Sequence, residues 1–307
     1  MIFDDLGRIE RTPIEERIAL FGTRRKAPCA HTKHRSNMML NPLRLKHLNR
    51  LDELDADVVT LNLEDAIAPE CKREALINIA LFLSHLSYSP SRIVVRTNPL
   101  DAGGEEEIAF LNDFGFDAVR IPKVRHRDDI AHALTLLNDD KELHASLETK
   151  EAFEALASLR IDARFTTVNL GILDLLHSLG LAQSLVTLDN PTIDYILAKF
   201  LVDAKTAGLH PVGFMFQAYE ETDAFRRWCE KEKAMGYASK ACMGPKQVAI
   251  ANAVFALSED ELARARHIVA RFEEESAKGN HGFMDERTGL FIDEPIYKDA
   301  LLTLRQA

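Results

Sequence analysis

The sequence predicts an α/β protein folded as a closed (β/α)8 TIM barrel with a C-terminal helical lid, and two observations lead to this fold. Short apolar runs alternate with longer amphipathic stretches almost from end to end, as in parallel strands joined by helices. Eight such units fit into 307 residues, which favours a barrel over an open doubly wound sheet. The open sheet stays an alternative, although the chain has neither of the glycine-rich phosphate-binding motifs that would favour it.

The expected strands are rich in Val, Ile, Leu and Phe and show no strict alternation of apolar and polar residues. Runs of this kind are typical of parallel strands that are buried on both faces. The strands are expected at residues 37–40, 57–63, 92–98, 118–124, 143–148, 165–170, 211–216 and 237–243.

Helices are expected between these runs, where apolar residues recur at three- and four-residue spacing. The clearest lie at residues 43–54, 128–137 and 218–235. Glycines follow several of the amphipathic stretches, at positions where helices commonly end. They are Gly115, Gly180, Gly208 and Gly236.

Three regions are expected along the chain. Residues 1–34 form an N-terminal arm, residues 35–257 form the barrel, and residues 258–307 form a C-terminal helical arm or lid. Within the last region, a charged helix is expected over 259–277 and a final helix over 295–306.

The composition excludes several classes of protein. With 38 Lys and Arg against 48 Asp and Glu, the net charge is −10, whereas nucleic-acid binding needs a dense basic surface. The longest apolar run, residues 75–83, is shorter than the roughly 20 residues that cross a bilayer. The chain start lacks a signal-peptide pattern, and four separated cysteines are typical of reduced thiols. We therefore expect a soluble, cytoplasmic protein with no membrane partner. The basic stretch at 24–26 is expected to be a solvated arm or a contact for an anionic partner.

Several expected strands end in charged residues, and in a barrel these ends meet on the face that carries the chemistry. They are Glu64, Asp65, Arg96, Lys123, Glu148 and, just beyond the sixth strand, Asp174. Four carboxylates in one cleft need compensating charge, which the two cations and a divalent metal ion could supply. Because carboxylate oxygens are the only ligands offered, Mg²⁺ or Mn²⁺ is expected rather than Zn²⁺.

Structural roles for the same residues remain open alternatives. A carboxylate at the end of a strand often serves only the first turn of the next helix, and this applies to Glu148 and Asp174. Arg96 could equally belong to a structural ion pair. The motifs HExxH, GxSxG and SxxK do not occur, so the sequence offers no common hydrolase signature in their place.

At these residues the sequence resembles the citrate lyase beta-subunit and malyl-CoA lyase family, whose superfamily includes the metal-dependent 2-oxo-acid aldolases. The resemblance extends from about Arg35 to the end of the chain, and its short motifs are specific when taken together. The matching segments are 63–69 with Lys72 (LEDAV-P--K), 95–99 (VRIN), 121–124 (PKV), 147–149 (IET), 171–175 (GAEDL) and 291–295 (MID-P).

The resemblance implies a (β/α)8 barrel, Mg²⁺, a homotrimer or a multiple of one, and acyl-CoA or related thioester substrates. By position, it makes Glu148 and Asp174 the metal ligands. It makes Arg96 the cation that faces the enolate oxygen of the thioester. It also makes Asp293 an acid/base group that the lid of a neighbouring subunit supplies.

Three departures from the family pattern bear on the substrate more than on the reaction type. Asn62 stands where the family often has the first Asp of LDLEDAV, and Gly244 stands where it has the His of GK--IHP-Q. The early element RS-L-VPG survives only as Arg35-Ser36 and Asn41-Pro42.

We therefore expect a Mg²⁺-dependent carbon–carbon lyase that cleaves a 3-hydroxyacyl thioester into an acyl thioester and a 2-oxo acid. Malyl-, citramalyl- and citryl-CoA are the expected kinds of substrate. Glu64 and Asp65 are expected to orient metal-bound water and Arg96. Two alternatives stay open: an aldolase that acts on free 2-oxo acids with the same metal pair, and a non-catalytic subunit of the same fold.

Overall fold

The computed structural model describes residues 1–29, 31 and 33–305. The chain forms two compact units, Met1–Phe255 and Ala256–Ala307, which are treated separately below. Parts of two expected regions lie outside the described residues: residues 30 and 32 of the arm, and residues 306 and 307 of the C-terminal region, of which 306 was expected to end the last helix. The expected boundaries after residues 34 and 257 stay predictions. No described helix is long and apolar enough to cross a membrane.

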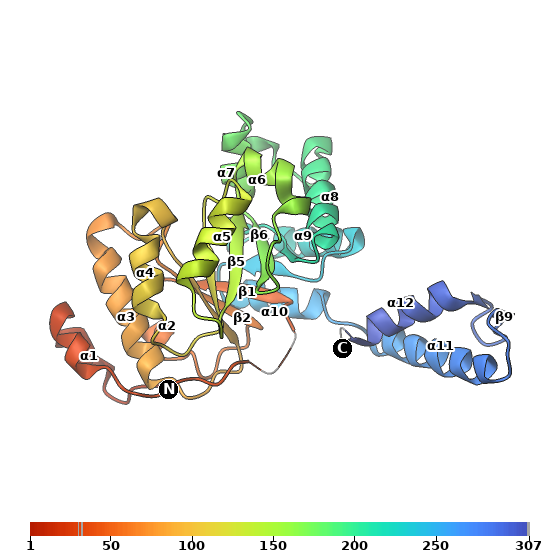
Figure 1. The fold of residues 1–307 in the computed structure, drawn as a ribbon, viewed down its shortest axis with the longest axis horizontal. Coiled ribbons are helices and arrows are strands. Elements are labelled where there is room, and N and C mark those ends of the chain that lie inside the picture. The colour runs from red at the N-terminus through yellow and green to blue at the C-terminus, as the bar shows by residue number, and fades with distance from the viewer. Residues whose placement is uncertain (30, 32, 306–307) are drawn as a thin grey trace. The chain divides into compact units, whose positions relative to one another are not determined.

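The first unit is built around an eight-stranded sheet in which all neighbouring strands are parallel (Figure 1). The strand order is β7-β6-β5-β4-β3-β2-β1-β8. The strands are β1 (Ser36–Leu40), β2 (Val58–Asn62), β3 (Arg92–Arg96), β4 (Ala118–Ile121), β5 (Glu142–Leu147), β6 (Phe165–Leu170), β7 (His210–Val212) and β8 (Lys240–Cys242).

The sheet closes where β7 meets β8. Gly213, the residue after β7, bridges to Lys240 in parallel, and its backbone nitrogen donates to the carbonyl oxygen of Ser239 over 3.0 Å. No side chain fits at this junction, because a Cβ on Gly213 would lie 1.9 Å from Oε2 of Glu232. That carboxylate is buried and accepts a hydrogen bond from Nζ of Lys240. The (β/α)8 barrel predicted from the sequence is therefore confirmed.

Helices connect the strands, and their arrangement follows the predicted alternation (Figure 1). The predicted helix at 43–54 is wrong in length, since only Leu45–Leu48 is α-helical, and the helix predicted from 218 begins at Thr222. The helices are α1 (Leu6–Arg11), α2 (Leu45–Leu48), α3 (Lys72–His85), α4 (Gly104–Leu111), α5 (Arg127–Leu136), α6 (Lys150–Ala155), α7 (Ile172–Ser178), α8 (Pro191–Thr206), α9 (Thr222–Met235) and α10 (Pro245–Val254). Short 3-10 helices lie at Ile14–Leu20, Pro69–Cys71, Leu100–Ala102, Leu156–Ser158 and Gln183–Leu185.

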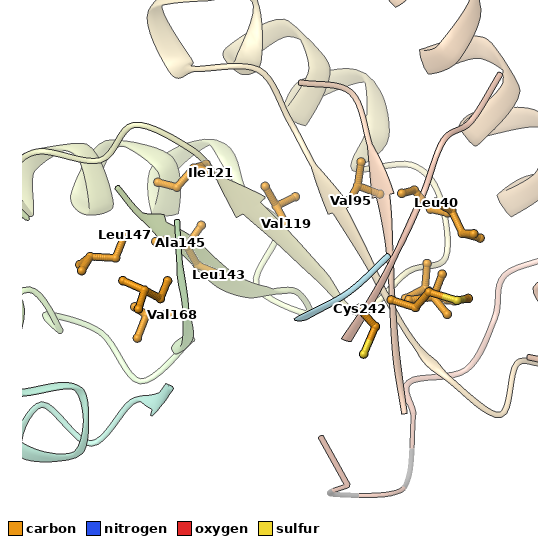
Figure 2. Packing of buried hydrophobic residues seen from close by; sticks show 14 of the residues in the cluster. Leu40, Val95, Val119, Ile121, Leu143, Ala145, Leu147, Val168 and Cys242 are labelled. Atoms are coloured by element: carbon orange, nitrogen blue, oxygen red, sulfur yellow. The ribbon is translucent and has the colours of Figure 1, made fainter. Parts of the chain in front are cut away.

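The main core lies between the strands and the surrounding helices. Val95, Val119 and Leu143 are fully buried members of this cluster, and Figure 2 shows them with further strand residues of the same layer. Alternate residues point into the barrel, where a small separate cluster contains Val58, Val94 and Ala118. Each strand therefore has one face in the core between strands and helices and the other face inside the barrel.

The inside of the barrel is polar next to that small apolar cluster. Nη2 of Arg120 donates to Oγ1 of Thr60 over 2.9 Å and to Oδ1 of Asn37 over 3.2 Å. Arg120 is paired in register with Arg96 on β3 and with His144 on β5. Strands that are mostly apolar in sequence thus carry a polar layer with two arginines inside the barrel.

The basic stretch at 24–26 is not a solvated arm throughout, which corrects that expectation. Lys26 is buried, and its Nζ donates to both carboxylate oxygens of Asp117 at 3.0 and 2.8 Å. The same carboxylate accepts from the backbone nitrogens of Cys29 and Ile93. The segment before β1 is therefore tied to the start of β4.

The second unit consists of two helices and a short hairpin: α11 (Glu259–Ala277), β9 (Phe283–Met284), β10 (Phe291–Ile292) and α12 (Glu294–Arg305). Ser258 and Glu261 form a capping box that fixes the start of α11, in agreement with the predicted helix at 259–277. Ile268, Phe272 and Ile292 contribute to a separate small core. The predicted C-terminal helical region is therefore confirmed.

Candidate active site

The carboxyl ends of the strands surround a cavity of about 380 Å³ in the first unit. Its charged lining residues are Asp65, Arg96, Arg120, Glu148 and Asp174. Four of these five were predicted from the ends of the strands. A barrel collects such residues at one face because the parallel strands all end there.

Glu148 follows the last residue of β5 and is only 3% exposed. Its Oε1 accepts a hydrogen bond of 2.8 Å from the backbone nitrogen of Lys123 and lies 3.5 Å from Nζ of that lysine. The neighbouring Thr149, not Glu148, caps α6, because its hydroxyl accepts from the nitrogen of Ala152. Burial raises the pKa of Glu148 above its ordinary value, and Lys123 acts in the opposite direction. The structure thus gives Glu148 no capping role.

Asp174 lies in the first turn of α7, with its side chain 48% exposed, and its Oδ1 is 3.2 Å from Nζ of Lys123. The ammonium of Lys123 therefore lies between the two carboxylates. Burial lowers the pKa of Lys123, but Glu148 and Asp174 raise it more, so the net shift is upward. The backbone of Lys123 has φ of +54°, in the left-handed region, which costs about 1 kcal/mol or more in a residue other than glycine.

The surroundings of Glu148 fit a divalent cation. A Cβ on Gly171 would lie 2.8 Å from Oε2 of Glu148, so glycine keeps the space beside that oxygen open. The amide of Asn169 is buried and lines the cavity, and neither its oxygen nor its nitrogen has a hydrogen-bond partner within the described chain. Carboxylate and amide oxygens are the hard ligands that Mg²⁺ prefers.

Only a small set of protein ligands is available for such a cation. The described residues contain no group of three or more His, Cys, Asp and Glu side chains that could hold a metal ion. A cation held by Glu148 and Asp174 would therefore keep several octahedral positions for water and substrate. That open coordination is what a Lewis-acid metal requires.

Arg96 ends β3 and is held by three neighbours. Its Nε donates to Oδ1 of Asn62 over 2.7 Å, its Nη1 lies 3.0 Å from Oε2 of Glu64, and its Nη2 lies 3.8 Å from Oδ2 of Asp65. Burial raises the pKa of Glu64 to about 7, although Arg96 beside it acts in the opposite direction. Asn62, which departs from the family pattern, thus orients Arg96 without adding charge.

Gly244, the other departure, lies against an aromatic side chain. A Cβ on Gly244 would lie 2.9 Å from the hydroxyl oxygen of Tyr219, and that hydroxyl accepts a hydrogen bond of 3.3 Å from the nitrogen of Lys246. A larger residue at position 244 would require Tyr219 to move. The loop before α9 therefore fills space next to the glycine.

Asp293 belongs to the second unit and starts α12. Its Oδ1 accepts from the backbone nitrogen of Ile296 over 3.3 Å, and its carbonyl oxygen accepts from Tyr297. These contacts give Asp293 a local role at the helix start. Its assignment as an acid/base group stays a prediction.

Arg120 is the charged lining residue of this cavity that the sequence analysis missed. It lies between apolar residues in the strand expected at 118–124, whose other charged residue, Lys123, stands near its end. A charged residue inside such a run is the signal that could have found it, because the interior of a barrel strand admits a charge only where something stabilises it.

The chain is similar to a known protein family and to several named proteins. The family model described as HpcH/HpaI aldolase/citrate lyase matches residues 35–245, more than half of the chain. A protein of Cereibacter sphaeroides named (3S)-malyl-CoA thioesterase is 30% identical over 253 residues, covering 81% of this chain and 87% of its own. A protein of the same species named L-malyl-CoA/beta-methylmalyl-CoA lyase is 27% identical over 280 residues, covering 82% and 87%.

Solved structures share the fold. The protein CitE of Mycobacterium tuberculosis, in complex with magnesium, acetoacetate and coenzyme A, superposes with a TM-score of 0.72 at 21% identity, covering 90% of this chain and 98% of that one. A citrate lyase of Burkholderia xenovorans superposes with a TM-score of 0.75 at 16% identity, covering 89% and 91%.

Proposed function

Because this chain belongs to the HpcH/HpaI aldolase/citrate lyase family, we propose that it is a Mg²⁺-dependent carbon–carbon lyase acting on a 3-hydroxyacyl thioester. The products would be an acyl thioester and a 2-oxo acid. One observation carries the proposal: Glu148 and Asp174 line the same cavity as Arg96, and both carboxylates lie within 3.5 Å of one cation, the ammonium of Lys123. Named relatives that act on malyl-CoA support the substrate class.

In this proposal Glu148 and Asp174 hold the metal ion, and Asn169 lies within the same cavity. The ion, when bound, supplies a Lewis acid that polarises the C–O bond that becomes the carbonyl of the 2-oxo acid. Structures of CitE that contain magnesium with acetoacetate or pyruvate support the choice of metal. Mn²⁺ has similar ligand preferences and is expected to substitute for it.

Arg96 acts on the other fragment. When the carbon–carbon bond breaks, its electron pair passes to the acyl thioester as an enolate, and the guanidinium of Arg96 stabilises the enolate oxygen. Glu64 and Asp65 orient Arg96 through their ion pairs with it. The substrate hydroxyl loses its proton as it becomes the carbonyl of the 2-oxo acid, and Asp293 supplies a proton to the enolate carbon, so no proton is gained or lost overall. In the reverse reaction Asp293 removes the proton from that carbon.

We further propose that the working form is a homotrimer or a multiple of one, in which Asp293 comes from a neighbouring copy. The resemblance to the family is the support for this assembly. The arrangement agrees with the separate second unit that carries Asp293.

A second candidate is hydrolysis of the thioester, and one comparison favours it: the relative that is 30% identical is named a thioesterase, whereas the lyase relative is 27% identical. Hydrolysis would replace cleavage of the carbon–carbon bond or follow it. The two activities differ in products, since only hydrolysis releases free CoA thiol.

The test is a panel of malyl-, citramalyl- and citryl-CoA together with free 2-oxo acids, incubated with Mg²⁺ and with EDTA. Separate detection of 2-oxo acid, acyl-CoA and free CoA thiol distinguishes the candidates. Metal-dependent 2-oxo acid supports the lyase, and thiol without 2-oxo acid supports the thioesterase. Turnover of free 2-oxo acids alone supports the aldolase. If no substrate is turned over and no metal binds, the result supports a non-catalytic subunit of the same fold.

A further inference from the structure

Arg120 is a buried cation that the proposed chemistry does not use. It is 3% exposed, lies inside the barrel on β4, and lines the cavity. In register it is level with His144, four residues before Glu148 along the neighbouring strand β5. At about 3.3 Å per residue, the backbone of Arg120 lies roughly 13 Å deeper along the strand than that of Glu148.

The charge of Arg120 has no carboxylate partner among the described residues, in contrast to Arg96 and Lys123. Arg96 lies 3.0 Å from Glu64, and Lys123 lies 3.2 Å from Asp174. Within the described residues, no carboxylate lies within 4.0 Å of Arg120. The two contacts of its Nη2, with Thr60 and Asn37, are to neutral oxygens.

These neutral contacts do not satisfy the guanidinium. Its Nε is buried and has no hydrogen-bond partner in the described part of the chain. A buried charge without an opposite charge beside it destabilises the folded protein. Burial, and to a smaller extent Arg96, lowers the pKa of Arg120 to about 9, while Glu148 acts in the opposite direction. An anion that enters the cavity would compensate this charge.

We propose that Arg120 is a specificity-determining residue that binds a second carboxylate of the substrate, carried on the 2-oxo acid fragment. This inference rests on the proposed function, in which Glu148 and Asp174 hold the metal ion that binds the first carboxylate. The CoA portion is too large for a cavity of about 380 Å³ and must extend through its opening, so the 2-oxo acid fragment points inward. The preferred fragment is therefore a 2-oxo dicarboxylate rather than a 2-oxo monocarboxylate.

The test compares binding of ligands of equal chain length in the presence of Mg²⁺. Isothermal titration gives the dissociation constants of 2-oxoglutarate against 2-oxopentanoate, and of oxaloacetate against 2-oxobutanoate. A hydrogen bond between charged groups contributes about 1.5–3 kcal/mol, so the wild-type protein should prefer a dicarboxylate by about tenfold or more. Arg120→Met should reduce this ratio to about twofold or less.

Two further variants keep the test decisive. Ser146→Ala changes the wall of the same cavity without changing its charge, and it should retain the wild-type ratio. Arg120→Lys keeps the positive charge but loses the planar guanidinium, and it should give an intermediate ratio. It also supplies a second variant if Arg120→Met does not fold.

The outcomes separate this inference from the proposed function. Equal binding of mono- and dicarboxylates by the wild-type protein, with Mg²⁺ dependence retained, would overturn the role of Arg120 and leave the lyase standing. A dicarboxylate preference that survives in both Arg120 variants would overturn it as well. Absence of Mg²⁺-dependent binding for every 2-oxo acid would overturn the proposed function itself.

Discussion

Replacement of Glu148 by Gln should remove Mg²⁺ binding while leaving the fold almost unchanged. The glutamine oxygen can still accept the 2.8 Å hydrogen bond from the backbone nitrogen of Lys123. The variant loses the attraction to Nζ of Lys123 at 3.5 Å, but it no longer has to bury a charge. These two effects oppose each other, so the free energy of unfolding without metal should change by less than about 1 kcal/mol.

The effect on metal binding is larger and can be measured without a substrate. A ligand at one hundred times its dissociation constant stabilises the native state by about 2.7 kcal/mol. For a domain of this size that corresponds to a rise in Tm of about 5 °C. The wild-type protein should show this rise when Mg²⁺ is added, and Glu148→Gln should show almost none.

Thermal unfolding with Mg²⁺ and with EDTA is the assay, and Glu154→Gln is the matched control. Glu154 is an exposed carboxylate on α6, six residues from Glu148, so its replacement should leave the Mg²⁺ effect at the wild-type value. If Glu148→Gln keeps half or more of the wild-type rise in Tm, the assignment of Glu148 as a metal ligand is refuted.

Three further predictions concern stability and assembly. Gly213→Ala should lower the free energy of unfolding by about 2–3 kcal/mol, because its Cβ would lie 1.9 Å from the carboxylate of Glu232; urea unfolding that matches wild type would contradict this. Burial of His144 lowers its pKa from 6.5 to about 4. The unfolded chain therefore binds a proton at this histidine at a higher pH than the native state does. As a result, the native state loses stability as the pH falls from 6.5 towards 4. The free energy of unfolding should fall by on the order of 2 kcal/mol between pH 6.5 and about pH 5. If the free energy of unfolding of the wild-type protein falls with pH no more steeply than that of His144→Gln, the prediction is refuted. If Asp293 acts across a subunit interface, mixing the inactive variants Arg96→Ala and Asp293→Ala in equal amounts should restore activity at about a quarter of the active sites, because that share combines an intact Arg96 with an intact Asp293. Mixed assemblies that stay inactive would contradict a site shared between subunits.

The barrel could be predicted because its strands carry their apolar residues in long uninterrupted runs. Val119 and Ile121 point outward into the main core, where side chains of this kind pack against helices. The same run hides Arg120, because inward and outward positions cannot be distinguished where almost every residue is apolar. The folded structure shows that Arg120 is level with Arg96 on β3 and lines the cavity.

Long-range pairing explains the other differences. The strand predicted at 211–216 is short because the chain after Val212 makes only the bridge through Gly213 that closes the barrel. Lys26 is buried because Asp117, a residue 91 positions away, accepts its hydrogen bonds. Neither fact follows from local sequence, since both depend on which distant segments meet in the folded chain.

Strand ends were informative for the candidate site because topology alone brings them together. Arg96 and Glu148 both follow apolar runs and both line the cavity. The sequence predicted that Lys123 compensates carboxylate charge. Its position between Glu148 and Asp174 could not be predicted, because it depends on a left-handed backbone at that residue.

The most direct test of the lyase assignment is the ratio of 2-oxo acid to acyl-CoA released from one hydroxyacyl-CoA in the presence of Mg²⁺. The account predicts that the two products appear together in equal amounts, and that both disappear with EDTA and in Glu148→Gln. Free CoA thiol without 2-oxo acid, or turnover that survives EDTA, would contradict it.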